Sequence, residues 1–141
     1  MPVLMEVVKR IGKTPKEVRR DFFEIMYNLN YEENMHLTIE EVIEEVHKSK
    51  GIVVSAHPKQ YDIESIKEVI SLGVDGIEAY YPTHTKEDIF ELKSLAKENN
   101  LIVTAGSDFH SPTDTRRHGN IGCVSLESEE LSAFLDRLRS V

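Results

Sequence analysis

Residues 51–58 read GIVVSAHP, and residues 101–110 read LIVTAGSDFH. Each stretch begins as a short run of β-branched and aliphatic residues and becomes polar at its end. Residues 76–81, GIEAYY, form a third such run, and the segments between the runs carry apolar residues at helical spacing. Short apolar runs that alternate with helical segments are typical of βα units around a parallel sheet. The sequence therefore predicts an α/β fold.

Helix start signals divide the rest of the chain into elements. A Thr or Asp that can cap a helix, followed by acidic residues, opens several segments whose apolar residues form one stripe. Helices are predicted at residues 17–29, 38–50, 63–72, 85–100 and 127–140. A further short strand is predicted near residues 122–126, GCVSL. We therefore expect three to four mainly parallel strands, preceded by two helices.

Composition limits the classes of function. The chain has 141 residues, of which 40% are hydrophobic and 30% charged, which fits one globular domain. A net charge of -8 disfavours an extended nucleic-acid surface, and the basic run Arg116-Arg117-His118 is large enough for only one phosphate group. No apolar stretch has the length of a membrane span or of a secretory signal, so we expect a cytoplasmic protein. The single cysteine, Cys123, excludes an internal disulfide and is expected to be buried.

Polar side chains gather at the ends of the predicted strands. His57 follows the first strand, Glu78 lies in the second with His84 behind it, and Asp108 and His110 follow the third. Ligands of parallel α/β folds bind at the carboxyl ends of the strands, where neighbouring loops meet. We therefore expect these five residues to lie near one functional edge.

The pattern Asp-x-His at 108–110 points to a metal site. Alternate residues of an extended segment share a face, so the carboxylate and the imidazole point the same way. Asp and His suit zinc, manganese or iron, and His57 offers another nitrogen. Each residue also has a structural reading: His57 as a hydrogen-bonded histidine, Asp108 as a turn residue, Glu78 as a strand-end charge and His84 as a loop residue.

The runs GIVVSAHP, GVDGIEAYYPTHT and LIVTAGSDFHSP resemble the C-terminal part of PHP-family (polymerase and histidinol phosphatase) phosphoesterases, over most of residues 37–122. The resemblance implies a distorted seven-stranded β/α barrel with a multinuclear site for divalent metal ions (Mn, Zn or Fe). It implies metal-ligand roles for His57, Asp108 and His110. Second-shell or substrate roles are expected for Glu78, His84 and Arg116. The implied reaction is hydrolysis of a small phosphorylated metabolite or nucleotide.

One departure from that family limits the inference. The family begins with a His-x-His strand, and this sequence contains no His-x-His. We therefore expect a helical segment at residues 1–36 and half of a barrel at residues 37–141. The leading interpretation is a phosphoesterase module that is incomplete in this chain. The alternatives are a non-catalytic remnant that binds metal or a partner, and an amidohydrolase-like barrel that acts on C–N bonds. Open barrel edges also predict a homo-oligomer, or a partner that supplies the missing N-terminal half.

Overall fold

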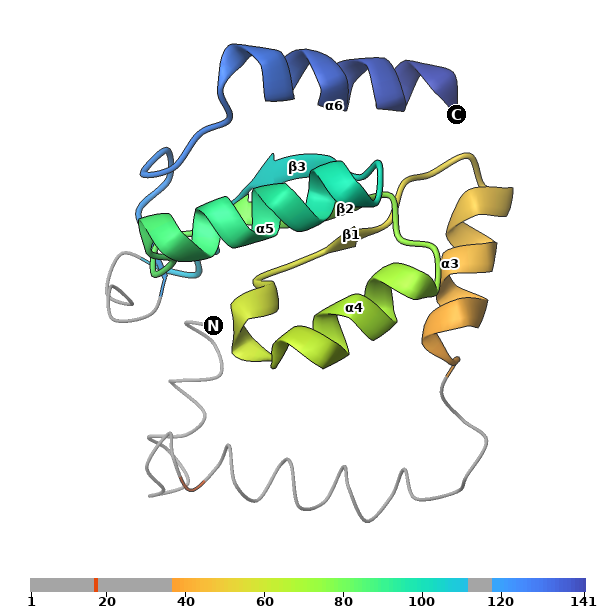
Figure 1. Ribbon diagram of the computed structural model, residues 1–141, viewed down its shortest axis with the longest axis horizontal. Helices are drawn as coiled ribbons and strands as arrows, with labels where there is room; N and C mark the ends of the chain where they lie inside the picture. The colour runs from red at the N-terminus through yellow and green to blue at the C-terminus, as the bar shows by residue number, and fades with distance from the viewer. Residues whose placement is uncertain (1–16, 18–36, 112–117) are drawn as a thin grey trace, which may run out of the picture. The chain divides into compact units, whose positions relative to one another are not determined.

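The computed structural model describes residue 17, residues 37–111 and residues 118–141 (Figure 1). The chain divides into two compact units, Met1–Leu37 and Thr38–Val141. Apart from residues 17 and 37, the described residues belong to the second unit, and the helix expected at residues 17–29 lies outside them except for residue 17 itself.

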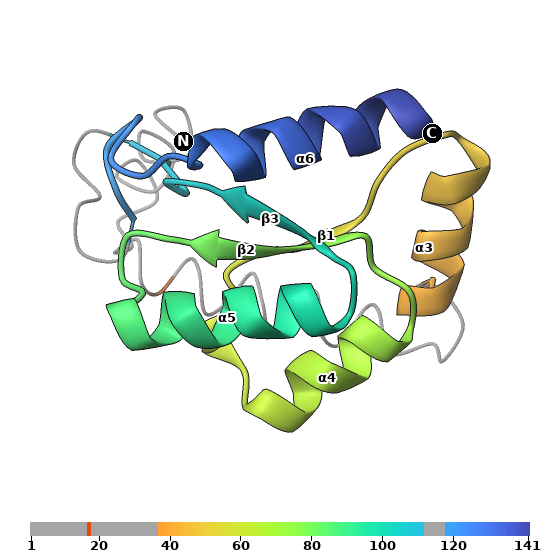
Figure 2. The same cartoon turned by 45° about the horizontal axis from the view of Figure 1, so that its top comes forward.

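The centre of this unit is a three-stranded parallel sheet. Its strands are β1 (Val54–Ser55), β2 (Gly76–Tyr80) and β3 (Ile102–Ala105), in the order β1-β2-β3. Val54 pairs with Gly76, and Gly76 pairs with Ile102, so the three strands start level with one another. Figure 2 shows β2 and β3 running in the same direction, with α6 beside β3. The predicted α/β fold with parallel strands is confirmed.

The helices begin where the capping signals place them. Thr38, Asp62 and Thr85 each accept a backbone hydrogen bond with the side chain at the start of a helix. The helices that follow the three caps are α3 (Ile39–Lys48), α4 (Ile63–Ser71) and α5 (Lys86–Glu98). A short 3-10 helix, η1 (Pro58–Gln60), follows β1, and α6 (Ser128–Ser140) closes the chain.

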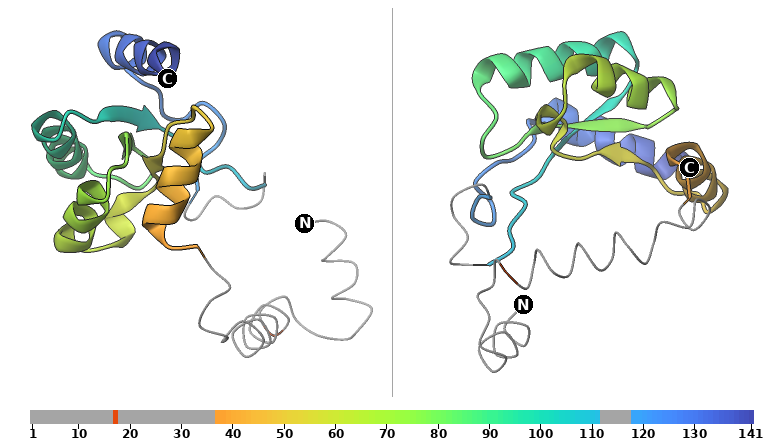
Figure 3. Two further views of the ribbon diagram at one scale, coloured as in Figure 1. Left: turned by 90° about the vertical axis from the view of Figure 1, so that its right-hand side faces the viewer. Right: turned by 90° about the horizontal axis from the view of Figure 1, so that it is seen from below.

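Side chains along β2 alternate between the core and the opposite face of the sheet. Ile77 and Ala79 are fully buried against a cluster from α4 and α5 that includes Ile66 and Leu92. Glu78, between them, therefore points to the other face of the sheet. Figure 3 shows α4 and α5 on one side of the strands, in agreement with this cluster.

An ion pair ties α6 to α5. The Lys93 Nζ atom lies 2.6 Å from Glu130 Oε1, and the Tyr80 hydroxyl lies 3.0 Å from the same oxygen. Burial alone would raise the pKa of Glu130, but the Lys93 ammonium holds that pKa below its ordinary value. The same contact raises the pKa of Lys93. The last helix is thus held to α5 by an ion pair and to Tyr80 of β2 by a hydrogen bond, and it also contacts β3.

Two expectations from the sequence are wrong. Residues 122–126 form turns and irregular structure, because Gly122 has a φ of 80° and the Cys123 amide closes a turn onto the Asn120 carbonyl oxygen. Cys123 is exposed and not buried.

No helix of the described residues is long and apolar enough to cross a membrane.

Truncation of a buried residue of α5 should cost more stability than truncation of an exposed residue of the same helix. Leu92 is 0% exposed and Phe90 is 75% exposed, and both belong to α5. We expect Leu92→Ala to lower the free energy of unfolding by about 2–5 kcal/mol, because it leaves a cavity in the core. Phe90→Ala should change it by less than about 1 kcal/mol. Urea unfolding of the full chain measures both, and equal losses would contradict this description of the core.

Candidate metal centre

His57 begins the candidate site at the end of β1. Its backbone has a φ of 35°, a left-handed conformation that is uncommon outside glycine and costs on the order of 1 kcal/mol. The His57 amide donates to Glu78 Oε2 at 2.8 Å, which holds the backbone in place. Among the described residues, His57 Nδ1 is the one buried side-chain nitrogen or oxygen without a hydrogen-bond partner. A buried imidazole nitrogen without a partner in the protein is available to a metal ion or to a water molecule.

Asp108 occupies the matching position beyond β3. Its φ is 51°, so it shares the left-handed conformation of His57. Its Oδ2 atom accepts a hydrogen bond from the Tyr81 hydroxyl at 2.8 Å. Strain of this kind persists only where the surroundings determine the conformation, and it is concentrated at functional sites.

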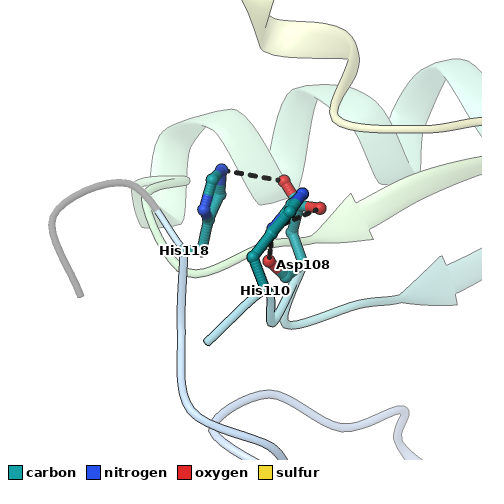
Figure 4. Close-up of side chains that lie close together, drawn as sticks. All are labelled: Asp108, His110 and His118. Atoms are coloured by element: carbon teal, nitrogen blue, oxygen red, sulfur yellow. Dashed lines mark hydrogen bonds and ion pairs between the residues drawn. The ribbon is translucent and has the colours of Figure 1, made fainter. Parts of the chain in front are cut away.

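Asp108, His110 and His118 converge on one point (Figure 4). One ligand atom from each lies within 4.8 Å of the other two. Asp108 Oδ2 lies 3.3 Å from His118 Nε2, and the rings of His110 and His118 stack with centroids 4.2 Å apart. Two imidazoles and a carboxylate thus share a small volume at the end of β3.

A hydrogen bond determines which nitrogen of His110 is available. His110 Nδ1 lies 2.6 Å from the backbone carbonyl oxygen of Asp108. A carbonyl oxygen can only accept, so Nδ1 carries a hydrogen in this contact and Nε2 is the ring nitrogen left to bind a metal ion. Metal-binding histidines commonly hold this arrangement, with one nitrogen donating to the protein and the other facing the metal.

His118 is the member of the group that sequence reasoning missed, because it was read as part of a basic run with Arg116 and Arg117. The chain returns to the site through a hydrogen bond from the Gly119 amide to the Ser107 carbonyl oxygen at 2.8 Å. That bond places residue 118 next to residue 108. Nothing in the local sequence pattern signals a contact between these two positions.

Tyr81 lies between the two strand ends. Its ring centroid is 6.0 Å from that of His57 and 5.1 Å from that of His84. His84 is itself anchored, since its Nδ1 lies 2.9 Å from the Ala79 carbonyl oxygen. Through Tyr81 the residues at the ends of β1 and β3 thus belong to one connected network.

Glu78 lies between His57 and Gly106 and contacts both. Its carboxyl group packs so closely on Gly106 that a methyl group at that position would collide with it. Burial raises the pKa of Glu78, the nearby Asp108 charge adds to the rise, and the hydrogen bond from the His57 amide opposes it. Glu78 therefore holds the backbone of His57 through the hydrogen bond from the His57 amide.

The donor set fits a divalent metal ion. Zinc lies about 2.0–2.2 Å from histidine nitrogen and carboxylate oxygen, so tetrahedral ligand atoms are separated by about 3.4 Å. One ligand atom each of Asp108, His110 and His118 lies within 4.8 Å of the other two, which is near that spacing. The unsatisfied Nδ1 of His57 is a further buried donor in the same network.

The residues singled out from the sequence thus differ in where they lie. Asp108 and His110 come together, while His57 lies outside that group and reaches Asp108 through Tyr81. Glu78 supports His57, and His84 packs on Tyr81. Arg116 lies outside the described residues. The ligand and substrate roles of all these residues remain predictions.

Comparison with known proteins gives partial matches. The sequence is 38% identical over 61 residues to the phosphoribosyl 1,2-cyclic phosphate 1,2-diphosphodiesterase of Eggerthella lenta, covering 43% of this chain and 23% of that protein. It is 32% identical over 81 residues to the 5'-3' exoribonuclease Rnm of Salmonella typhimurium, covering 53% and 28%. The chain spans about a quarter of the length of these curated relatives. No family model matches the sequence.

A solved structure extends the match at the level of the fold. The crystal structure of a proposed metal-dependent phosphoesterase from Bifidobacterium adolescentis superposes with a TM-score of 0.56 at 24% identity. The match covers 76% of this chain and 41% of that one. The partial coverage fits the predicted correspondence to the C-terminal part of such proteins. The resemblance read from the sequence is therefore confirmed: the homologues of this chain are PHP-family phosphoesterases, of which it matches a part.

Proposed function

We propose that this chain supplies metal ligands to a phosphoesterase that acts on a small phosphorylated metabolite or nucleotide. The observation that carries the proposal is the convergence of Asp108, His110 and His118 at the carboxyl end of β3. Parallel α/β folds bind their ligands at that edge. The donors are of the type that binds zinc, manganese or iron.

The relatives support the choice of reaction. One is named for a cyclic phosphate of ribose and another for RNA, so a phosphoester bond is common to both names. A divalent metal at such a centre supplies Lewis-acid chemistry, polarising phosphoryl oxygens and neutralising the charge that develops on them. An amidohydrolase-like reaction on C–N bonds stays an alternative, because one matching solved structure is described as an amidohydrolase.

The residues of the chain would prepare this centre. Asp108 provides negative charge, and His110 is oriented by the bond from its Nδ1–H to the Asp108 carbonyl oxygen. His118 faces the same carboxylate at 3.3 Å. Glu78 fixes the His57 backbone and leaves the ring nitrogen of His57 as a further donor.

The alternative proposal is a remnant that binds metal or a partner without catalysis. It is favoured by the missing His-x-His, because a two-ion phosphoesterase needs more ligands than this chain offers in the group at Asp108. Metal binding is common to both proposals, and phosphoester hydrolysis separates them.

Metal binding is the first test. We expect the chain to bind about one divalent ion, because Asp108, His110 and His118 together supply the three protein ligands of a single tetrahedral site. A water molecule would take the fourth position. Asp108→Asn and His118→Ala should each weaken binding at least tenfold, since each removes a charge or a donor. His47→Ala is the matched control, because His47 is an exposed histidine of α3 that pairs with Asp75. Elemental analysis and calorimetry with Mn²⁺ and Zn²⁺ give the result, and equal metal content in all variants would refute the site.

Hydrolysis is the second test. With Mn²⁺ present, the chain should release p-nitrophenol from p-nitrophenyl phosphate faster than Asp108→Asn does, because the carboxylate is needed to hold the metal. Equal release by the two proteins, with metal binding retained in the wild type, would favour the non-catalytic alternative over the enzyme.

Self-association belongs to the same proposal, with a second copy of the chain as the partner. Leu131, Leu135 and Leu138 form one stripe on α6 and are 46%, 39% and 43% exposed. The first turn of α6 is acidic at Glu129, and its last turn is basic at Arg139. Antiparallel pairing of two copies would cover the stripe and bring each acidic end against a basic end.

A charge placed in the stripe should separate the copies. We expect the wild-type chain to be a dimer in light scattering after gel filtration, and Leu135→Glu to be a monomer, because an unpaired carboxylate cannot be buried in an apolar contact. Tyr61→Glu is the control, since Tyr61 is a large residue that is 62% exposed outside α6. A wild-type chain that stays monomeric at high concentration would overturn this part of the proposal.

A further inference from the structure

Tyr81 is a buried residue whose polar atom contacts the candidate centre. It follows β2 directly and is 5% exposed. A buried tyrosine hydroxyl requires a hydrogen-bond partner. The hydroxyl of Tyr81 donates to Asp108 Oδ2 at 2.8 Å, so a residue of the core donates to the carboxylate of the site.

The ring of Tyr81 is held on two sides, and this determines where its hydroxyl lies. The His57 ring meets it edge-on, with a centroid distance of 6.0 Å and an interplanar angle of 68°. The His84 ring lies 5.1 Å away and is anchored to the Ala79 carbonyl oxygen. Tyrosine has only two side-chain torsions, and burial of the ring between these neighbours fixes both.

A fixed donor restricts the orientation of the Asp108 carboxylate. A carboxylate can rotate about two bonds, and each rotation changes which oxygen faces His110 and which faces His118. In the structure, Oδ1 lies 3.6 Å from His110 Nδ1 and Oδ2 lies 3.3 Å from His118 Nε2. The hydrogen bond from Tyr81 to Oδ2 selects this orientation and still leaves lone pairs on both oxygens.

We propose that Tyr81 is a positioning residue that orients the Asp108 carboxylate for metal binding through its hydroxyl. The inference rests on the proposed metal centre. Residues that hydrogen-bond to metal ligands typically change metal affinity by about 10–100-fold when they are mutated. Removal of the hydroxyl alone should therefore weaken metal binding while the ring keeps the packing.

The test is a Co²⁺ titration of the full 141-residue chain, followed by visible absorption. Tyr81→Phe should raise the dissociation constant about tenfold and alter the absorption bands of bound Co²⁺, because the carboxylate is no longer held in one orientation. The melting temperature without metal should stay close to that of the control. The control is Tyr80→Phe, which removes the neighbouring hydroxyl that bonds to Lys93 of α5 and Glu130 of α6.

Each result is decisive. Weaker Co²⁺ binding with altered bands in Tyr81→Phe but not in Tyr80→Phe supports the proposal. Unchanged affinity and bands in Tyr81→Phe, with normal binding by the wild type, overturn it and leave the metal centre standing. A Tyr81→Phe chain that fails to fold overturns it too, since the hydroxyl would then be a structural requirement. A wild-type chain that binds no Co²⁺ removes the metal centre and this inference together.

Discussion

The alternation of side chains along β2 is the constraint on which the rest of the unit depends. Ile77 and Ala79 are fully buried against the helices, so Glu78 must point to the opposite face. From that face it accepts the amide of His57 and packs on Gly106. A shift of one residue in β2 would bury the carboxylate in the core and expose Ile77. The same pattern thus builds the core and supports the candidate centre.

Two of the four non-glycine residues with positive φ in the described part of the chain lie at the strand ends of the candidate centre, and the other two, Lys50 and Asn100, follow α3 and α5. His57 and Asp108 both have left-handed φ values, although neither is glycine. Each is held by a contact to the segment around β2, His57 through Glu78 and Asp108 through Tyr81. Rigid packing of β2 against α4 and α5 therefore stabilises conformations that the isolated strand ends would not adopt.

The fold was largely predictable from the sequence because its signals are local. Capping residues such as Thr85 fix the starts of helices, and β-branched runs mark the strands, so both can be read within a few residues. The strand expected at residues 122–126 failed because Gly122 adopts a positive φ. Asp108 and His110 could be paired from their spacing. His118 could not, because its position depends on a hydrogen bond between Gly119 and Ser107 that no sequence pattern encodes. Tyr81 enters the sequence analysis only as part of the predicted strand GIEAYY, and its contact with Asp108 is seen only in the structure.

The hydrogen bond between Gly119 and Ser107 affects the free energy of metal binding at the centre. It brings His118 back to Asp108 and His110, so a metal ion held by both histidines would close the intervening segment into a ring. Such an ion acts as a removable cross-link, and the free energy of binding then includes the entropy lost when that segment is closed. The entropy lost on closure grows only slowly with the number of residues enclosed. A longer or shorter ring would therefore change the affinity of the centre for its metal ion only slightly.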